Sequence, residues 1–189
     1  MTGCSVDVDA DADGWTLVAG YQPVMGTHLD LQITAASEAE ARAAESVALA
    51  ESARLESVFT VFDPCSDLCL WRGGAEASPT AELATLLGSA AAWQRRSGGA
   101  FNPLTGVLTQ RWQRAVDDGI APPDEELADL AASIATPRFA VVDDVVARSG
   151  DCSGVDLNAI AKGHVVDHVA SRVMADGTVA RLVVNAGGD

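Results

Sequence analysis

The chain has 189 residues, which is enough for one sizeable hydrophobic core. Hydrophobic residues make up 48% of it and charged residues 21%, a balance typical of globular rather than disordered proteins. The formal net charge of −15 argues against sequence-independent nucleic-acid binding, because no basic surface is available to neutralise phosphates. The same charge argues against docking on an anionic membrane surface.

The N-terminal stretch "MTGCSVDVDADADGW" has neither the basic start nor the apolar core of a signal peptide. No apolar run in the sequence has the length of a membrane span. We therefore expect a cytoplasmic protein without a membrane span. We also expect residues 1–14 to form an acidic disordered tail and residues 15–189 to form one domain.

Two strands and a long helix are predicted next. In "WTLVAGYQPVMGTHLDLQIT", residues 15–34, a turn at Met25-Gly26-Thr27 separates two stretches, and the second alternates apolar and polar residues. In "SEAEARAAESVALAESARLESVF", residues 37–59, Ser37 and Glu40 form a capping box at the start of a helix. The residues that follow near helical spacing along it are Val47, Ala50, Arg54, Leu55 and Val58.

The middle of the chain is predicted to be a loop followed by helices. The stretch "VFDPCSDLCLWRGGAEASP", residues 61–79, is predicted as a loop with exposed aromatic side chains. Ser78 as a cap and Pro79 in the first turn then predict a helix that ends at Gly98-Gly99. "AFNPLTGVLTQRW" predicts a turn before a short helix, and "GIAPPDEEL" predicts a linker before another helix that reaches Ile134.

The last third alternates between strand and helix. "RFAVVDDVVARSG" predicts a hairpin that turns at Asp143-Asp144, and "ARLVVNAGG" predicts a final strand. Between them a helix is predicted from Asn158 to Ala175, with Val166, Val169, Ala170 and Val173 on one face. This mixed order favours an α+β fold with a mixed or antiparallel sheet. The sequence has neither a GxGxxG nor a GxxxxGK[ST] motif, so neither of the common nucleotide-binding folds is indicated.

The stretch "VDLNAIAKG", residues 155–163, carries the chemistry that stands out. A helix N-terminus offers unpaired N–H groups and a partial positive charge, which suit a phosphate or a diphosphate. We expect Asn158 to cap this terminus, Lys162 to add a positive charge one turn later, and Asp156 to accept hydrogen bonds from a bound ligand. An ordinary capped helix with a surface lysine would have the same spacing, so the pattern alone leaves both interpretations open.

Four separated motifs resemble the ApbE family of FAD:protein FMN transferases. They are "VMGTHLDLQI", "SGGAFNPLTGVLTQRW", "VDLNAIAKGHVVDHVA" and "LVVNAGGD", and they occur in the same order as in that family. The resemblance extends from about Tyr21 to Asp189. It implies an α+β fold that binds FAD with Mg²⁺ at its diphosphate. It also implies transfer of the FMN moiety to a threonine hydroxyl of an acceptor protein, with release of AMP.

The resemblance also implies roles for individual residues. Met25 would pack against the flavin, and Phe62 would take the place of an aromatic residue that stacks on it. Positions implied to contact FAD elsewhere are Ala100, Phe101, Asn102, Asp156 and Lys162. The backbone carbonyl of Ala159 matches a magnesium ligand, and residues 185–189 match a turn near the site.

The sequence departs from the family pattern at several positions, among them a displaced threonine in the turn ("NPLT") and His164 in place of a tyrosine. The turn has Asn102 where the family has an aspartate, and the chain ends at Asp189, before the family's remaining magnesium ligands and catalytic histidine. None of His28, His164 and His168 lies at the position of that base. The sequence therefore predicts an incomplete copy of the family domain and assigns no catalytic residue. A non-catalytic relative that binds FAD or a protein partner is the alternative.

Overall fold

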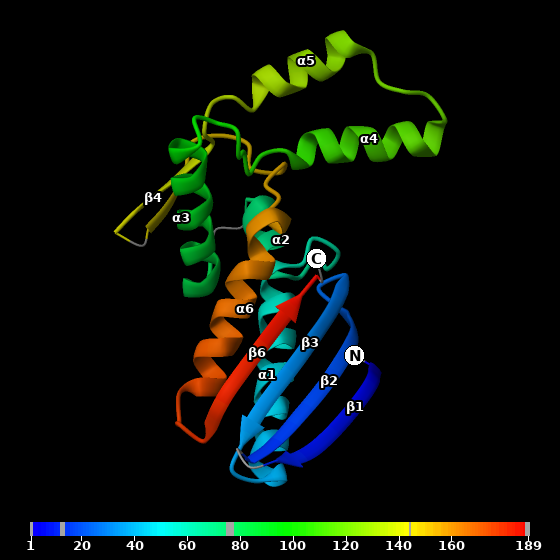
Figure 1. Cartoon of the computed structure of the whole chain (residues 1–189). Coiled ribbons are helices and arrows are strands. Elements are labelled where there is room, and N and C mark those ends of the chain that lie inside the picture. Colours follow the sequence, from blue (N-terminus) through cyan, green and yellow to red (C-terminus); the bar gives the residue numbers. More distant parts are fainter. Residues whose placement is uncertain (1, 12–13, 75–77, 144, 188–189) are drawn as a thin grey trace. The chain divides into compact units, whose positions relative to one another are not determined.

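The computed structural model describes residues 2–11, 14–74, 78–143 and 145–187, with the backbone alone for residues 2–11 (Figure 1). The chain divides into two compact units. The sheet unit comprises residues 1–57 and 161–189, and the helical unit comprises residues 58–160. No helix within the described ranges is both long enough and apolar enough to cross a membrane.

The sheet unit is built on one antiparallel sheet in the order β1-β2-β3-β6, with α1 and α6 on one of its faces (Figure 1). Its strands are β1 (Thr2–Asp11), β2 (Gly14–Val24), β3 (Thr27–Ala35) and β6 (Val179–Ala186). Its helices are α1 (Glu38–Phe59) and most of α6 (Asn158–Met174). Leu29, Leu31 and Ile33 are buried, which confirms the alternation predicted for the second strand.

Helix α1 begins as predicted, and its buried face differs in part from the residues expected at helical spacing. The Ser37 hydroxyl accepts from the Glu40 N–H at 3.3 Å and donates to the Glu40 carboxylate at 3.1 Å, which confirms the capping box. Of the residues expected at helical spacing, Leu55 is buried, whereas Val47 and Ala50 are exposed. The buried apolar residues of α1 are Ala41, Ala44, Ala48, Leu55 and Phe59. Alanines lie on several sides of this helix, so hydrophobicity alone does not single out the face that the sheet covers.

The N-terminal residues, predicted as a disordered tail, form β1 in the structure. This strand pairs with β2 from Thr2, opposite Gln22, to Asp11, opposite Gly14. Its sequence alternates valine or alanine with aspartate from Val6 to Asp11, a period of two that fits a strand. The high charge suggested a solvated tail, but backbone pairing with β2 is independent of side-chain charge.

Helix α6 ends at Met174, one residue before the predicted end. Its buried face includes Val165 rather than the predicted Val166. The buried residues follow one another at a spacing of four: Ala161, Val165, Val169 and Val173. Val166 and Ala170, which were predicted on the inner face, are only half-buried. A spacing of four keeps one stripe of small and β-branched residues against the sheet.

The helical unit contains four helices and a two-stranded hairpin among its described residues. They are α2 (Asp67–Arg72), α3 (Ala81–Arg96), α4 (Gly106–Asp118), α5 (Asp124–Ser133), β4 (Phe139–Val142) and β5 (Val145–Arg148). The hairpin is confirmed, and α3 packs along it (Figure 1). The Trp71 ring meets the Phe139 ring edge to face at 5.5 Å, so these side chains link α2 to β4.

Two predictions for the segment before α3 are wrong. The stretch predicted as a loop contains α2, and Trp71 in that helix is buried rather than exposed. The cap of α3 is Thr80, not Ser78: its hydroxyl accepts from the Leu83 N–H at 3.3 Å. Asp67 fixes this cap, because its carboxylate accepts from both the N–H and the hydroxyl of Thr80. At the other end, Gly98 and Gly99 have positive φ, as predicted for a left-handed stop.

Candidate functional site

Met25 lies in the sheet unit, in the tight turn between β2 and β3. Met25 has a φ of +51° and Gly26 a φ of +73°, the backbone pattern of a two-residue type I′ turn. Positive φ is uncommon for methionine and costs conformational energy. The Glu56 carboxylate of α1 accepts the Met25 N–H at 2.9 Å and helps to hold this conformation. The turn therefore presents a half-exposed methionine side chain from a fixed backbone.

Lys162 also belongs to the sheet unit and lies close to the end of β6. A Cβ placed on Gly187 would be 3.9 Å from the Lys162 Cδ, and the Gly187 N–H donates to the His28 carbonyl at 3.1 Å. Next to it, the Asn185 amide donates to the Asp30 carboxylate at 3.4 Å, and His28 Nε2 lies 3.6 Å from the same oxygen. The predicted turn at 185–189 thus begins beside an exposed lysine, while Gly188 and Asp189 lie outside the described residues.

Phe62 lies in the helical unit, in the loop that precedes α2, and its side chain is 91% exposed. Its own N–H is bonded to the Thr60 hydroxyl at 3.2 Å, and the Ser66 hydroxyl donates to the Thr60 carbonyl at 2.7 Å. Ser66 also caps α2 by accepting the Cys69 N–H at 3.1 Å. A fixed backbone with an almost fully exposed aromatic ring suits stacking on a flat ligand.

The turn Ala100–Asn102 is held by the side chain of Asn102. The Asn102 Oδ1 accepts from the Leu104 N–H at 2.9 Å and from the Gln94 amide at 3.3 Å, and its Nδ2 donates to the Ile134 carbonyl at 2.9 Å. The side chain therefore joins α3, the start of α4 and the end of α5. The family pattern has an aspartate here, and an aspartate has no N–H to donate to the Ile134 carbonyl. The asparagine of this chain therefore makes a hydrogen bond that the family residue would not make.

Asp156 is brought next to that turn by backbone hydrogen bonds. The Asp156 N–H donates to the Pro103 carbonyl at 2.7 Å, and the Gly106 N–H donates to the Gly154 carbonyl at 3.0 Å. The Asp156 carboxylate accepts the Asn158 N–H at 2.9 Å. The prediction that Asn158 caps α6 is thus wrong: Asn158 is the first helical residue, and Asp156 takes up its free N–H group.

Ala159, the predicted metal ligand, is the second residue of α6. A carbonyl at this place in a regular helix already accepts the N–H of the residue four positions on, which leaves one lone pair for another partner. Among the described residues no group of three or more His, Cys, Asp or Glu side chains could hold a metal ion. Mg²⁺ is commonly bound by one or two carboxylates together with substrate phosphates and water. The described residues therefore fit an ion that is bound partly by substrate phosphates better than one bound by protein side chains alone.

The predicted residues are divided between the two units. Met25 and Lys162 belong to the sheet unit, and Phe62, Ala100–Asn102 and Asp156 belong to the helical unit. Within the helical unit the structure brings the last two segments together. Sequence reasoning missed residues that hold the predicted segments, such as Glu56 at the Met25 turn and Arg72 at the Ser153 carbonyl. Their partners lie 31 and 81 residues away in the sequence, so no local spacing could indicate them.

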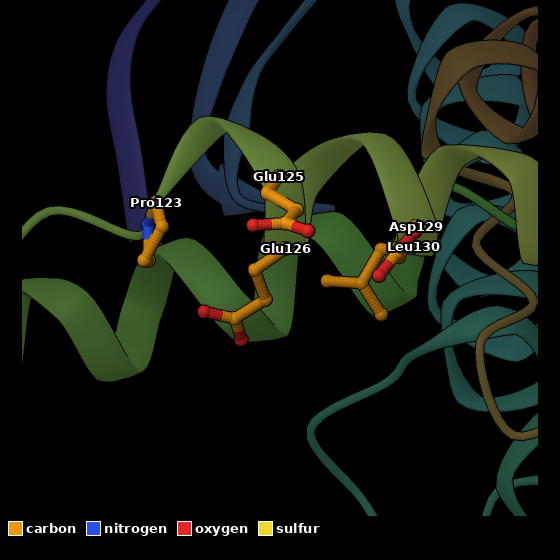
Figure 2. Close-up of a pocket in the computed structure, with 5 residues that line it drawn as sticks. All are labelled: Pro123, Glu125, Glu126, Asp129 and Leu130. Carbon is orange, nitrogen blue, oxygen red and sulfur yellow. The ribbon is translucent and has the colours of Figure 1, made fainter.

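A hollow of about 460 Å³ on α5 is not lined by any predicted site residue (Figure 2). Its lining is Pro123, Glu125, Glu126, Asp129 and Leu130. Arg111 of α4 pairs with Glu126 at 2.5 and 2.9 Å, and this hydrogen bonding lowers the pKa of Glu126. The remaining carboxylates would repel the diphosphate of a dinucleotide, so this hollow does not suit such a ligand.

Comparison with known proteins identifies the family. The family model described as the ApbE family matches residues 25–189, which is most of the chain. The chain belongs to the ApbE family. No match is found among curated proteins.

The structure is similar to three solved ApbE proteins. The flavin transferase ApbE from Vibrio cholerae has a TM-score of 0.76 at 18% identity, over 96% of this chain and 58% of that one. The flavinyl transferase ApbE from Pseudomonas stutzeri has 0.72 at 19% identity, over 90% and 59%. The ApbE protein from Thermotoga maritima has 0.72 at 19% identity, over 97% and 57%. These likenesses confirm the predicted α+β, ApbE-like fold, and the chain spans less than two thirds of the length of these relatives.

Proposed function

We propose that this ApbE-family chain takes part in Mg²⁺-dependent transfer of FMN from FAD to a threonine hydroxyl of an acceptor protein. The observation that carries the proposal is the pairing of the Ala100–Asn102 turn with the Asp156 segment, two motifs far apart in the sequence. Family membership and the fold shared with proteins named flavin transferases support it. Because the chain spans less than two thirds of the length of these relatives, the proposal concerns the contribution of these residues to the activity.

In this proposal the FAD-contacting residues are those implied by the family resemblance. The Met25 side chain and the Phe62 ring contact the isoalloxazine. The remaining contacts are made by Ala100, Phe101, Asn102, Asp156 and Lys162. Lys162 is suited to the diphosphate because it is an exposed cation in a chain of strongly negative charge. Asp156 offers one carboxylate oxygen that the Asn158 N–H does not occupy.

The transfer is a phosphoryl-type displacement. The threonine oxygen forms a bond to the phosphorus of the FMN half, the bond from this phosphorus to the bridging oxygen breaks, and AMP leaves with that oxygen. The hydroxyl proton is lost to a base that we do not assign to any residue of this chain. Such a reaction depends on neutralising the diphosphate and aligning the hydroxyl. Mg²⁺ would supply charge neutralisation, and the Ala159 carbonyl is the ligand that we propose for it.

A second candidate is a non-catalytic FAD-binding role. The residues assigned above contact FAD and none of them is assigned as the base, so the same contacts would serve binding without transfer. The two candidates differ in one observable. Incubation with FAD, Mg²⁺ and a threonine-bearing acceptor domain gives a covalent FMN mass increase on the acceptor only if the chain transfers. A chain that binds FAD but leaves the acceptor mass unchanged would support the non-catalytic candidate.

The FAD assignment is tested by three single substitutions. Met25→Gly keeps the positive φ of the turn without strain and removes only the side chain, so the fold should be as stable or slightly more stable. We expect Met25→Gly, Lys162→Ala and Asp156→Ala each to weaken FAD binding at least tenfold, or about 1.4 kcal/mol. Met174→Ala, an exposed methionine at the end of α6, is the matched control and should bind FAD normally. Unchanged affinity in all three variants would refute the assignment.

A further inference from the structure

Arg72, the last residue of α2, connects this helix to the segment that precedes Asp156. Its Nε donates to the Ser153 carbonyl at 2.9 Å, and its Nη2 donates to the same oxygen. Two donors from one planar guanidinium fix the direction of the side chain as well as its distance from the carbonyl. The sequence separation of 81 residues makes this bond a long-range connection within the helical unit.

The other end of α2 carries the Phe62 loop. The Ser66 hydroxyl bonds both the first turn of α2, at the Cys69 N–H, and the loop, at the Thr60 carbonyl. The helix has only six residues. This short helix therefore joins the Phe62 loop at one end to Arg72 at the other.

The segment that receives Arg72 is itself fastened to the predicted FAD turn. Directly after Ser153, the Gly154 carbonyl accepts the Gly106 N–H, and two residues later the Asp156 N–H donates to the Pro103 carbonyl. Arg72 thus links the Phe62 loop, through α2, to the chain segment Ser153–Asp156. Each of these partners belongs to the helical unit.

Arg148 also binds the C-terminal end of α2, and a hollow lies next to the Arg72 connection. Its guanidinium donates to the carbonyls of Trp71 and Arg72 and lies 5.5 Å from the centre of the Trp71 ring. The Trp71 carbonyl also accepts the Gly74 N–H at 3.1 Å, so Arg148 adds a second donor there and supplies a donor to the Arg72 carbonyl at the helix end. A hollow of about 250 Å³ adjoins the connection and is lined by Val61, Cys69, Arg72, Gly73 and Ser153.

We infer that Arg72 is a positioning residue that sets the Phe62 ring relative to Asp156 for stacking on bound flavin. The inference rests on the proposed function, because it assigns the purpose of the connection to FAD binding. A purely structural connection would stabilise the helical unit without affecting how Phe62 contributes to affinity. The two interpretations therefore differ in the energetic coupling between Arg72 and Phe62.

A double-mutant cycle on FAD affinity measures that coupling. We expect Arg72→Met and Phe62→Ala each to weaken FAD binding about tenfold, and the double variant to be weakened about tenfold as well. The second change adds little because Arg72 acts through the Phe62 ring. Arg72→Lys, which keeps one donor, should recover part of the affinity. An additive loss of about a hundredfold, or normal binding by Arg72→Met, would overturn the inference.

Arg138→Met is the matched control in the same unit. Arg138 also donates to a backbone carbonyl, that of Ser133 at 2.8 Å, but it is not connected to the Phe62 loop by a described hydrogen bond. Its loss should leave FAD affinity and the bound flavin fluorescence unchanged. An equal loss of affinity in this control would mean that any weakening of the helical unit impairs binding, which contradicts a specific role for Arg72.

Hydrogen exchange without FAD separates this inference from the proposed function. Arg72→Met should speed amide exchange at Cys69 and Asp156, relative to both the wild type and Arg138→Met. Wild-type protein that fails to bind FAD would refute the proposed function, while faster exchange would still establish the connection between the two segments. Unchanged exchange at both amides would refute the connection itself.

Discussion

Replacing Asn102 by aspartate tests how the predicted FAD turn is held. The change keeps the shape of the side chain and its Oδ1, so the bonds from the Leu104 N–H and the Gln94 amide can persist. It replaces the Nδ2 donor with an oxygen that faces the Ile134 carbonyl at the former hydrogen-bond distance of 2.9 Å. Ile134 is buried, so this carbonyl has little access to water.

The magnitude follows from the bond that is lost. A net hydrogen bond contributes about 1 kcal/mol, and a buried acceptor left without a partner costs about 1–3 kcal/mol. The carboxylate strengthens the two remaining bonds and offsets part of this cost. We expect the free energy of unfolding to fall by about 2 kcal/mol at neutral pH, which corresponds to a melting temperature about 4–8 °C lower.

The pH dependence gives the sign of the effect. A carboxyl group facing a carbonyl ionises less readily when folded, so its folded pKa lies above the unfolded value of about 3.9. The protonated group can donate to Ile134, and this stability is lost as pH rises through the folded pKa. Urea unfolding at pH 5 and pH 8 should therefore show a larger deficit, relative to the wild type, at pH 8.

Asn158→Asp is the control for this comparison. Asn158 is exposed in the first turn of α6, where a negative charge is stabilising by up to about 1 kcal/mol. This variant should be at least as stable as the wild type. Equal stability of Asn102→Asp and the wild type at pH 8 would refute the role assigned to the Asn102 side chain.

Three further predictions concern titration and reactivity. Tyr21 is the only tyrosine of the sequence, and burial, followed by its hydrogen bond to Glu45, raises its pKa. At pH 10.5, just above the usual tyrosine pKa of about 10, phenolate absorbance should therefore be missing until the protein unfolds. Hydrogen bonding to Arg54 lowers the pKa of Glu51. Glu51→Gln should therefore lower the free energy of unfolding, measured with urea, by up to about 1 kcal/mol at pH 7, and by progressively less as the pH falls below about 4.3. Burial raises the pKa of the Cys152 thiol, and Ellman's reagent should leave it unlabelled at pH 8 in the native protein; rapid native labelling would contradict its burial.

Features fixed by local chemistry could be predicted from the sequence. The capping box at Ser37, the stop at Gly98-Gly99 and the alternation along β3 each depend on residues within a few positions of one another. The inner face of α1 could not be predicted in this way, because many alanines give the helix several apolar sides. Helix α2 could not be recognised in the sequence, because its six residues are too few to show a helical periodicity.

The candidate site shows the same division. The resemblance located Ala100–Asn102 and Asp156 by their motifs, and backbone hydrogen bonds bring these two segments together. The Asp156 cap of the α6 terminus was assigned to Asn158, since both residues are good acceptors and the choice depends on where the helix begins. Arg72 was not recognised at all, because its partner Ser153 is identified only by the folded chain.

The most direct test of the account is a fluorescence titration of FAD with this 189-residue chain, with and without Mg²⁺. The account predicts saturable quenching of the flavin that is tighter with Mg²⁺ and weakened at least tenfold in Met25→Gly and Asp156→Ala. No quenching at any protein concentration, or quenching that neither Mg²⁺ nor these variants alter, would contradict the assignment of these residues to FAD.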